Sequence, residues 1–277
     1  MSKIENIELE ITELNRLRGV WVYLPDNYDE HGAPLPVIYM HDGQNLFYDR
    51  LTAFGKSWGV DKTLDKLFAE TGESCIVVGV ESNDKYRLSE YSPWKIDTFA
   101  FRQKRTLARN RHNRGGDGRK YGEWFAKTLK PYVDSHYNTD RERIATAVAG
   151  SSMGGYISCY LGLNYQRIYE TMGLFSTHTI FNERAFYKFE KNTSQALPQH
   201  AMVYVGGKEW GDERRDKQYV AKSRKLYDRL VKRGISCEFV VNSNFNHYES
   251  SWEVYFGKFA RDFLARYYDY KQKEQNS

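Results

Sequence analysis

Cysteine and proline are scarce in this chain. The 277 residues contain three cysteines, Cys75, Cys159 and Cys237, and only six prolines. An odd number of cysteines without a CxxC pair indicates neither a disulfide framework nor a thiolate zinc site. Few prolines and 21 glycines exclude a collagen-like or low-complexity chain. Residues 1–19 also lack the apolar segment of a secretion signal, so we expect reduced thiols and a cytoplasmic protein.

Long hydrophobic runs are missing as well. The longest uncharged stretch, residues 144–166, contains four glycines and three serines. A strand, a tight turn and a buried helix explain that composition better than a membrane span does. The net charge of +5 is a mild excess. Residues 102–120 alone hold eight basic residues and one acid, so the rest of the chain is slightly acidic.

Short β-branched and aromatic runs alternate with helical apolar stripes along the chain. The expected strands are residues 19–24, 37–41, 75–80, 144–149, 169–175, 202–205 and 237–241. Helices are expected where apolar residues recur at helical spacing, within residues 58–68, 125–132, 156–163, 218–233 and 252–267. This alternation predicts an α/β fold with a mostly parallel central sheet and helices on both faces. We expect one domain over residues 1–277, enlarged by an inserted loop or lid near residues 88–120.

The sequence Gly150-Ser151-Ser152-Met153-Gly154 carries the clearest chemical signal. It follows an expected strand and precedes an expected helix, which is the setting of a Gly-x-Ser-x-Gly nucleophile elbow. In such an elbow, Ser152 has a positive φ and its hydroxyl lies above the sheet. The glycines are required because the strand and the helix pass close together. The alternative is an ordinary Gly/Ser turn that packs a helix on a strand.

A serine nucleophile needs a base and an acid from later loops. Among the histidines after Ser152, His247 follows the strand at residues 237–241 and precedes the last helix, where the base belongs. His200 precedes its strand, and His178 leaves no room for an acid before the base. Glu209 is the first carboxylate after the strand at residues 202–205, and Asp212 is the alternative acid.

Ester hydrolysis also requires amide donors for the oxyanion. One is expected from Met153, the residue after the nucleophile, and the other from Gln44 in the loop after the strand at residues 37–41. Gly43 would let that backbone turn inward. The alternative is a simple Asp-Gly turn. Aromatic residues in loops expected near the same edge, Trp58, Trp94 and Trp210, are candidates for substrate binding, although such side chains more often pack in a core.

These stretches resemble the putative esterase family of α/β-hydrolases, which includes feruloyl and acetyl-xylan esterases and enterochelin-type siderophore esterases. The resemblance spans about residues 19–265. It rests on residues 37–47, 77–80, 90–93, 129–137, 149–155 and 205–209, with Arg87, His247 and Trp252. It implies that Ser152 is the nucleophile, that His247 is the base and that Glu209 occupies the acid position. The sequence departs from the family pattern in its glutamate at the acid position and in its basic insertion.

The sequence therefore predicts a serine carboxylesterase that acts through an acyl-enzyme on a small-molecule ester, without a metal or an organic cofactor. Hydrolysis of an anionic siderophore trilactone and acyl transfer to an alcohol remain alternatives within the same chemistry. A different alternative is an inert scaffold that binds nucleic acid or a protein partner through the basic residues 102–120. We expect neither a nucleic acid nor a membrane as partner, and the sequence does not predict the oligomeric state.

Overall fold

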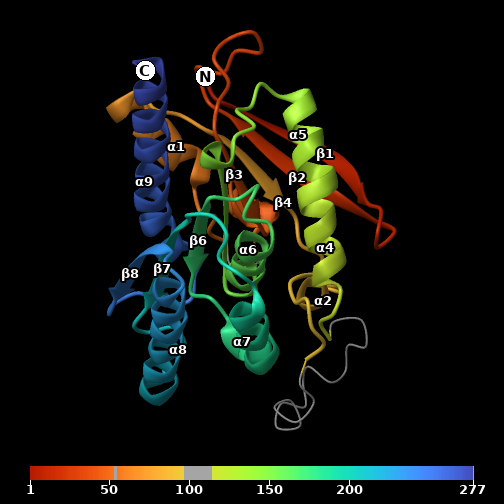
Figure 1. Ribbon diagram of the computed structural model, residues 1–277, viewed down its shortest axis with the longest axis vertical. Coiled ribbons are helices and arrows are strands. Elements are labelled where there is room, and N and C mark those ends of the chain that lie inside the picture. The colour runs from red at the N-terminus through yellow and green to blue at the C-terminus, as the bar shows by residue number, and fades with distance from the viewer. Residues whose placement is uncertain (53–54, 97–113, 277) are drawn as a thin grey trace.

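An eight-stranded β-sheet forms the centre of the computed structural model, which describes residues 1–52, 55–96 and 114–276. The strand order is β1-β2-β4-β3-β5-β6-β7-β8 (Figure 1). The strands are β1 (Lys3–Ile11), β2 (Arg16–Leu24), β3 (Val37–His41), β4 (Ile76–Val80), β5 (Thr146–Ser151), β6 (Thr171–Phe175), β7 (His200–Gly206) and β8 (Ser236–Asn242). Strand β2 is antiparallel to β1 and β4, and every other pair is parallel. The predicted mostly parallel sheet is confirmed.

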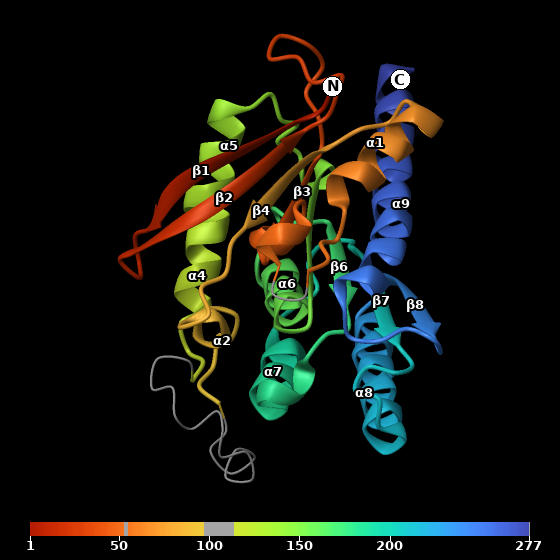
Figure 2. The same cartoon turned by 180° about the vertical axis from the view of Figure 1, so that it is seen from behind.

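Helices connect the parallel strands and cover both faces of the sheet (Figures 1 and 2). They are α1 (Val60–Thr71), α2 (Arg87–Glu90), α4 (Gly118–Trp124), α5 (Lys130–His136), α6 (Met153–Asn164), α7 (Glu183–Asn192), α8 (Glu213–Lys232) and α9 (Glu249–Gln275). A π-helical turn, Phe125–Leu129, joins α4 to α5. Short 3-10 helices occupy Gly43–Asn45, Asp49–Leu51, Arg143–Ala145 and Thr179–Asn182.

Two hydrophobic cores lie on opposite faces of the sheet because successive side chains of a strand point to opposite sides. In β3, Val37 and Tyr39 belong to one core, whereas Ile38 and Met40 belong to the other. The first core includes buried residues of α4 to α8, and the second includes those of α1 and α9. All five residues of β3 are buried, which explains why this strand lacks an alternating pattern.

Strand β1 was not among the expected strands. Its residues alternate between apolar and charged types, with Ile7, Leu9 and Ile11 on one side and glutamates between them. The high charge of residues 1–19 concealed this period of two. His200 is the first residue of β7 and therefore lies at the amino end of this strand. This position agrees with the expectation that His200 precedes its strand and is not the base.

The expected insertion at residues 88–120 joins α2 to α4. Its ends are helical, since α2 ends at Glu90 and α4 begins at Gly118. Lys95 and Gly115 form an antiparallel bridge that brings the two sides of the insertion together. Most of the predicted basic run, residues 102–113, lies outside the described residues.

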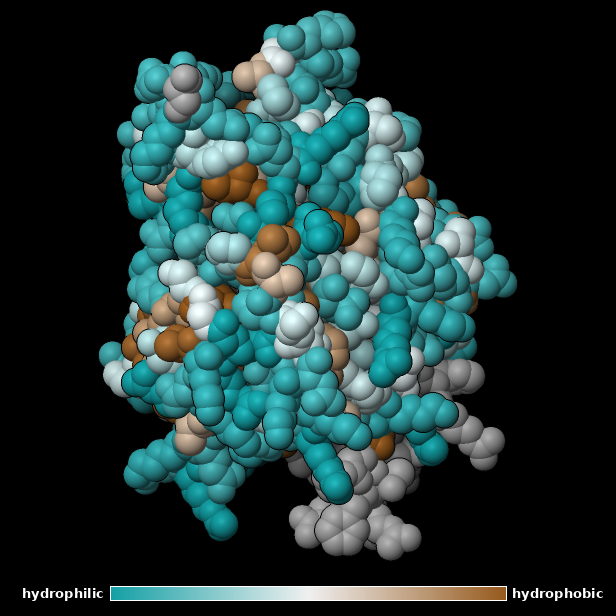
Figure 3. All heavy atoms as spheres, in the orientation of Figure 1, coloured by the Kyte–Doolittle hydropathy of each residue, from teal (hydrophilic) through white to brown (hydrophobic). Residues whose placement is uncertain are grey.

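The surface seen in Figure 3 is mostly hydrophilic, and the hydrophobic residues on this face form small separate patches. Within the described ranges, no helix combines the length and the apolar character that are needed to cross a membrane.

Candidate active site

The nucleophile elbow forms where β5 ends and α6 begins. Ser152 has φ 55° and ψ −117°, a positive-φ conformation that is rare for residues other than glycine, and its amide donates to the Phe175 carbonyl at 2.9 Å. A Cβ on Gly150 would approach the Gly154 backbone to 2.8 Å, so the turn requires glycine there. Because α6 starts at Met153, its first amides and the positive end of its dipole lie next to the serine. The geometry predicted for residues 150–154 is confirmed.

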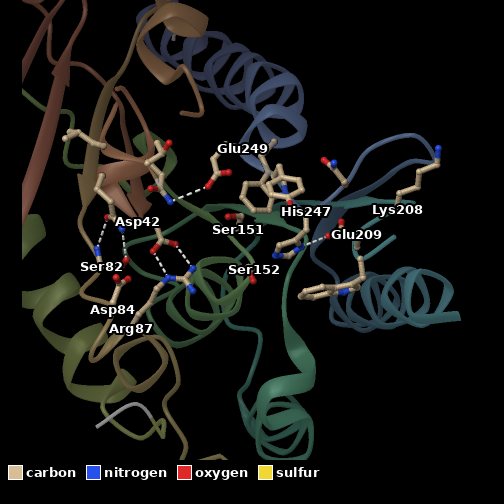
Figure 4. Close-up of a pocket in the computed structure, with 18 of the residues that line it drawn as sticks. Asp42, Ser82, Asp84, Arg87, Ser151, Ser152, Lys208, Glu209, His247 and Glu249 are labelled. Carbon is tan, nitrogen blue, oxygen red and sulfur yellow. Dashed lines mark hydrogen bonds and ion pairs between the residues drawn. The ribbon is translucent and has the colours of Figure 1, made fainter. Parts of the chain in front are cut away.

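Loops at the carboxyl ends of the parallel strands converge on one pocket of about 1360 Å³. Ser152, Glu209 and His247 line it after β5, β7 and β8, respectively, and Gln44 lines it after β3. Figure 4 shows the imidazole of His247 directed toward Ser152 across this pocket. This edge of a parallel α/β sheet is where ligands bind in folds of this class.

Glu209 and His247 are directly hydrogen-bonded. His247 Nδ1 donates to Glu209 Oε2, and the acid side chain is fully buried. The second carboxylate oxygen, Oε1, accepts hydrogen bonds from Ser176 Oγ and from the Gly206 amide, both at 2.6 Å. These contacts fix the carboxylate, and the carboxylate in turn orients the imidazole with its other nitrogen available for Ser152.

Aromatic rings enclose the imidazole on three sides. The Trp210 ring stacks on His247 with a centroid distance of 5.2 Å and an interplanar angle of 18°. The rings of Trp252 and Tyr219 stand edge-on to it at 5.1 and 5.9 Å. His247 therefore has little freedom to rotate away from Glu209, although its side chain keeps 16% of its surface exposed toward the pocket.

The loop after β3 is shaped for backbone donation into the pocket. Asp42 adopts a left-handed conformation with φ 58°, and a Cβ on Gly43 would lie 2.3 Å from the Gly79 carbonyl oxygen. The Gln44 side chain is tied to Ser82 by two hydrogen bonds of 2.8 and 3.0 Å. Neither the Gln44 amide nor the Met153 amide donates a backbone hydrogen bond to any described residue. That Gln44 and Met153 donate to an oxyanion stays a prediction.

A partly buried ion pair supports the same loop. Arg87 donates from Nε and Nη2 to the two carboxylate oxygens of Asp42 at 2.7 and 2.8 Å. Burial would raise the pKa of Asp42, but the guanidinium outweighs it and lowers that pKa below its usual value. The Asp42 amide also donates to the Tyr91 hydroxyl at 3.0 Å. Asp42 is thus ionised and held at three points.

Two of the predicted substrate-binding residues do not reach the pocket. Trp58 is 3% exposed and packs against Phe175 and Trp252 in the second core. Trp94 packs between α6 and α7, against Tyr160 and other aromatic residues. A position near the correct edge of the sheet did not determine the direction of either side chain, so both assignments are wrong. Trp210 lines the pocket and is 41% exposed.

Asp212, the alternative acid, lies away from the imidazole. Its side chain caps the amino end of α8 by accepting a hydrogen bond from the Arg215 amide at 2.8 Å, and the residue is exposed. Asp212 therefore has the environment of a helix cap, whereas Glu209 has the contact that an orienting acid needs.

Several residues near the reacting groups were not predicted from the sequence. Ser176, with φ 43° at the end of β6, binds Glu209 and accepts a hydrogen bond from Trp252 Nε1 at 3.0 Å. Glu249 lines the pocket two residues after His247. A serine directly after a buried strand was a usable signal for Ser176. Across residues 1–52, 55–96 and 114–276, no three His, Cys, Asp or Glu side chains gather closely enough to hold a metal ion.

The chain is similar to known proteins over most of its length. It is 24% identical over 223 residues to a Bacillus subtilis (strain 168) protein named "Uncharacterized protein YbbA", covering 79% of this chain and 80% of that protein. A solved structure named "ferulic acid esterase" superposes with a TM-score of 0.70 at 16% identity, covering 96% of this chain and 99% of the other. The enterobactin esterase FES from Shigella flexneri superposes with a TM-score of 0.71 at 15% identity, covering 94% of this chain and 58% of the other.

These structures share the α/β-hydrolase type of fold with this chain. The family model described as "Putative esterase" matches residues 11–263, which includes the elbow, Glu209 and His247. Because this match covers most of the 277 residues, the chain belongs to that esterase family.

Proposed function

We propose that the protein is a serine carboxylic-ester hydrolase that acts through an acyl-enzyme on Ser152. The observation that carries the proposal is the hydrogen bond from His247 to the buried Glu209, next to a serine on a nucleophile elbow. The family of esterases to which the chain belongs supports the same chemistry and a small-molecule ester as substrate.

In the proposed reaction, His247 removes the proton of Ser152 as the serine oxygen attacks the ester carbonyl. The amides of Gln44 and Met153 donate hydrogen bonds to the oxyanion of the tetrahedral intermediate. His247 then protonates the departing alcohol, which leaves the acyl group on Ser152. Water, activated by the same imidazole, releases the acid. Glu209 holds the imidazole in the required tautomer and stabilises the imidazolium ion.

The direct test is hydrolysis of p-nitrophenyl butyrate by the wild type and by Ser152→Ala. Substitution should reduce kcat by about 10³-fold or more, because it removes the nucleophile. A fluorophosphonate probe should add its mass to the wild type and leave Ser152→Ala unlabelled. Ser158→Ala is a matched control, since Ser158 is a buried serine of the same helix that bonds the Gly154 carbonyl. Undiminished hydrolysis by Ser152→Ala would exclude the nucleophile assignment.

A second candidate substrate is an anionic siderophore lactone, which the similarity to the enterobactin esterase favours. Lys85, Arg87 and Lys208 line the pocket and could face negative charge, although Arg87 is already paired with Asp42. Rates on matched feruloyl, acetyl and catecholate siderophore esters would rank these classes. Product analysis with an added alcohol would separate hydrolysis from acyl transfer, because transfer would yield a new ester.

A further inference from the structure

Glu249 is a buried carboxylic acid in the wall of the reaction pocket. It is 4% exposed, lies at the first position of α9 and shares the pocket with Ser152 and His247. Figure 4 shows the Glu249 side chain among the residues that line the cavity, with Asp42 and Arg87 to one side of it and His247 to the other. The mechanism proposed above gives this side chain no part.

This carboxylate has few partners among the residues that the structure describes. Asn45 Nδ2 donates to Glu249 Oε1 at 3.4 Å, which is a long hydrogen bond. No described Lys, Arg or His forms an ion pair with it. Burial raises the pKa of Glu249, and its own backbone amide partly offsets that rise. A buried acid whose described side-chain partner is one long hydrogen bond from Asn45 is costly for folding, which favours a role in binding.

The position of Glu249 indicates which part of an ester it would meet. It lies two residues after His247, the group that protonates the departing alcohol in the proposed reaction. It also contacts Asn45, which belongs to the loop that carries the Gln44 amide. The carboxylate therefore lies close both to the base, which would protonate the departing alcohol, and to the loop of Gln44.

We propose that Glu249 is a specificity-determining residue that accepts a hydrogen bond from a donor on the alcohol part of the substrate. The donor is a hydroxyl or a protonated amine close to the ester oxygen. The neighbouring lining residues favour the hydroxyl, since Asn45, Ser82, Asn244 and Asn246 can also bond neutral polar groups. This inference rests on the proposed esterase function and specifies its substrate class.

The test compares three butyrate esters that differ only in the alcohol. The 2-hydroxyethyl ester carries a neutral donor, the 2-(dimethylamino)ethyl ester carries a charged donor, and the 2-methoxyethyl ester carries none. The wild type should show a kcat/KM at least about tenfold higher for a donor ester than for the methoxy ester, as expected for a hydrogen bond to an acid. Glu249→Leu should bring this ratio to within about twofold of one. Because both rates come from one preparation, the ratio does not depend on the folded fraction.

Two further variants sharpen the result. Glu249→Gln keeps one acceptor oxygen without charge, so it should retain part of a hydroxyl preference and lose an ammonium preference; it also serves if the leucine variant does not fold. Glu253→Gln, one turn further along α9 and paired with Lys56 at 2.8 Å, should keep the wild-type ratio. Equal rates on all three esters in the wild type, or a preference that survives Glu249→Leu, would overturn the inference while leaving the esterase function in place. Hydrolysis of no ester would instead refute the proposed function, and this inference with it.

Discussion

Arg87 binds both carboxylate oxygens of Asp42, which lies two residues before Gln44 in the loop after β3. Asp42 is a non-glycine residue in a left-handed conformation, which is costly unless other contacts hold it. The two-point ion pair supplies such a contact, and the Tyr91 hydroxyl supplies another through the Asp42 amide. These contacts hold the backbone next to Gln44 before a substrate arrives, which the oxyanion role that we propose for the Gln44 amide requires.

Replacement of Arg87 by lysine should lower kcat by about 10-fold to 100-fold with less than about threefold change in KM, because a lysine cannot bind both carboxylate oxygens in the same plane. Affinity for a trifluoromethyl ketone inhibitor, which forms the oxyanion, should fall by a similar factor. Arg229→Lys alters another arginine–glutamate pair, between α8 and α7, in which two guanidinium nitrogens bind one oxygen of Glu190, and it should leave both values near wild type. A change confined to KM would argue for substrate contact instead.

The two acid candidates should separate in one experiment. Glu209→Gln replaces the buried acceptor of the His247 proton, so kcat should fall by about 10² to 10⁴-fold. Asp212→Ala removes only a helix cap, so it should lower the free energy of unfolding by about 1 kcal/mol and leave kcat/KM near wild type. Ester hydrolysis and urea unfolding of both variants would measure this. The reverse pattern would assign the acid to Asp212.

The hydroxyl of Ser176 should support the site through its bond to Glu209 and through the bond that it accepts from Trp252. Ser176→Ala removes one of the donors to Oε1, and we expect kcat to fall by about tenfold with little change in KM. Ser176 also has a positive φ, so Ser176→Gly provides a control for backbone strain. If the hydroxyl is what matters, both variants lose the same activity. Recovery in the glycine variant alone would show that strain, and not the hydrogen bond, accounts for the loss.

The position of a residue was predictable from the sequence where the backbone topology determines it, and was not predictable where it depends on the packing of a side chain. Ser152, Glu209 and His247 were predictable because their positions follow from strand ends, glycines and chain order, which the parallel sheet converts into proximity. Trp58 and Trp94 were misassigned because the direction of a loop side chain depends on packing, and both rings found apolar neighbours.

Contacts between residues that are far apart in the chain also could not be predicted from the sequence. Arg87 and Asp42 are 45 residues apart and Ser176 and Glu209 are 33 apart, and neither pair has a local pattern. A role for the Glu249 carboxylate could likewise be inferred only after the structure placed it in the pocket. Strand β1 was missed for a local reason, because its charged residues concealed the alternation.

Acid should destabilise the protein through His41, at the end of β3. This side chain is buried, contacts the Tyr121 hydroxyl at 3.0 Å and lies against the Tyr91 and Phe125 rings. Burial lowers its pKa from 6.5 to about 3; Asp42 opposes this shift and Arg87 adds to it. Between these two pKa values the unfolded chain binds a proton that the folded protein does not. The contribution of His41 to the free energy of unfolding is therefore fully present above pH 6.5 and is lost progressively as the pH drops toward 3.

The size of this effect can be measured by urea unfolding at pH 7.5 and pH 5. His41 should account for a loss of about 2 kcal/mol between them, since each pH unit below the unfolded pKa costs about 1.4 kcal/mol. The pKa of His200 is also lowered, to about 4, whereas that of Glu249 is raised, so other groups titrate in the same window. The difference between wild type and His41→Asn isolates one residue: the variant should lose less stability over this interval. His31→Asn, at an exposed loop position, should follow the wild type. If His41→Asn matched the wild-type dependence, His41 would take up its proton without unfolding and the burial argument would be wrong.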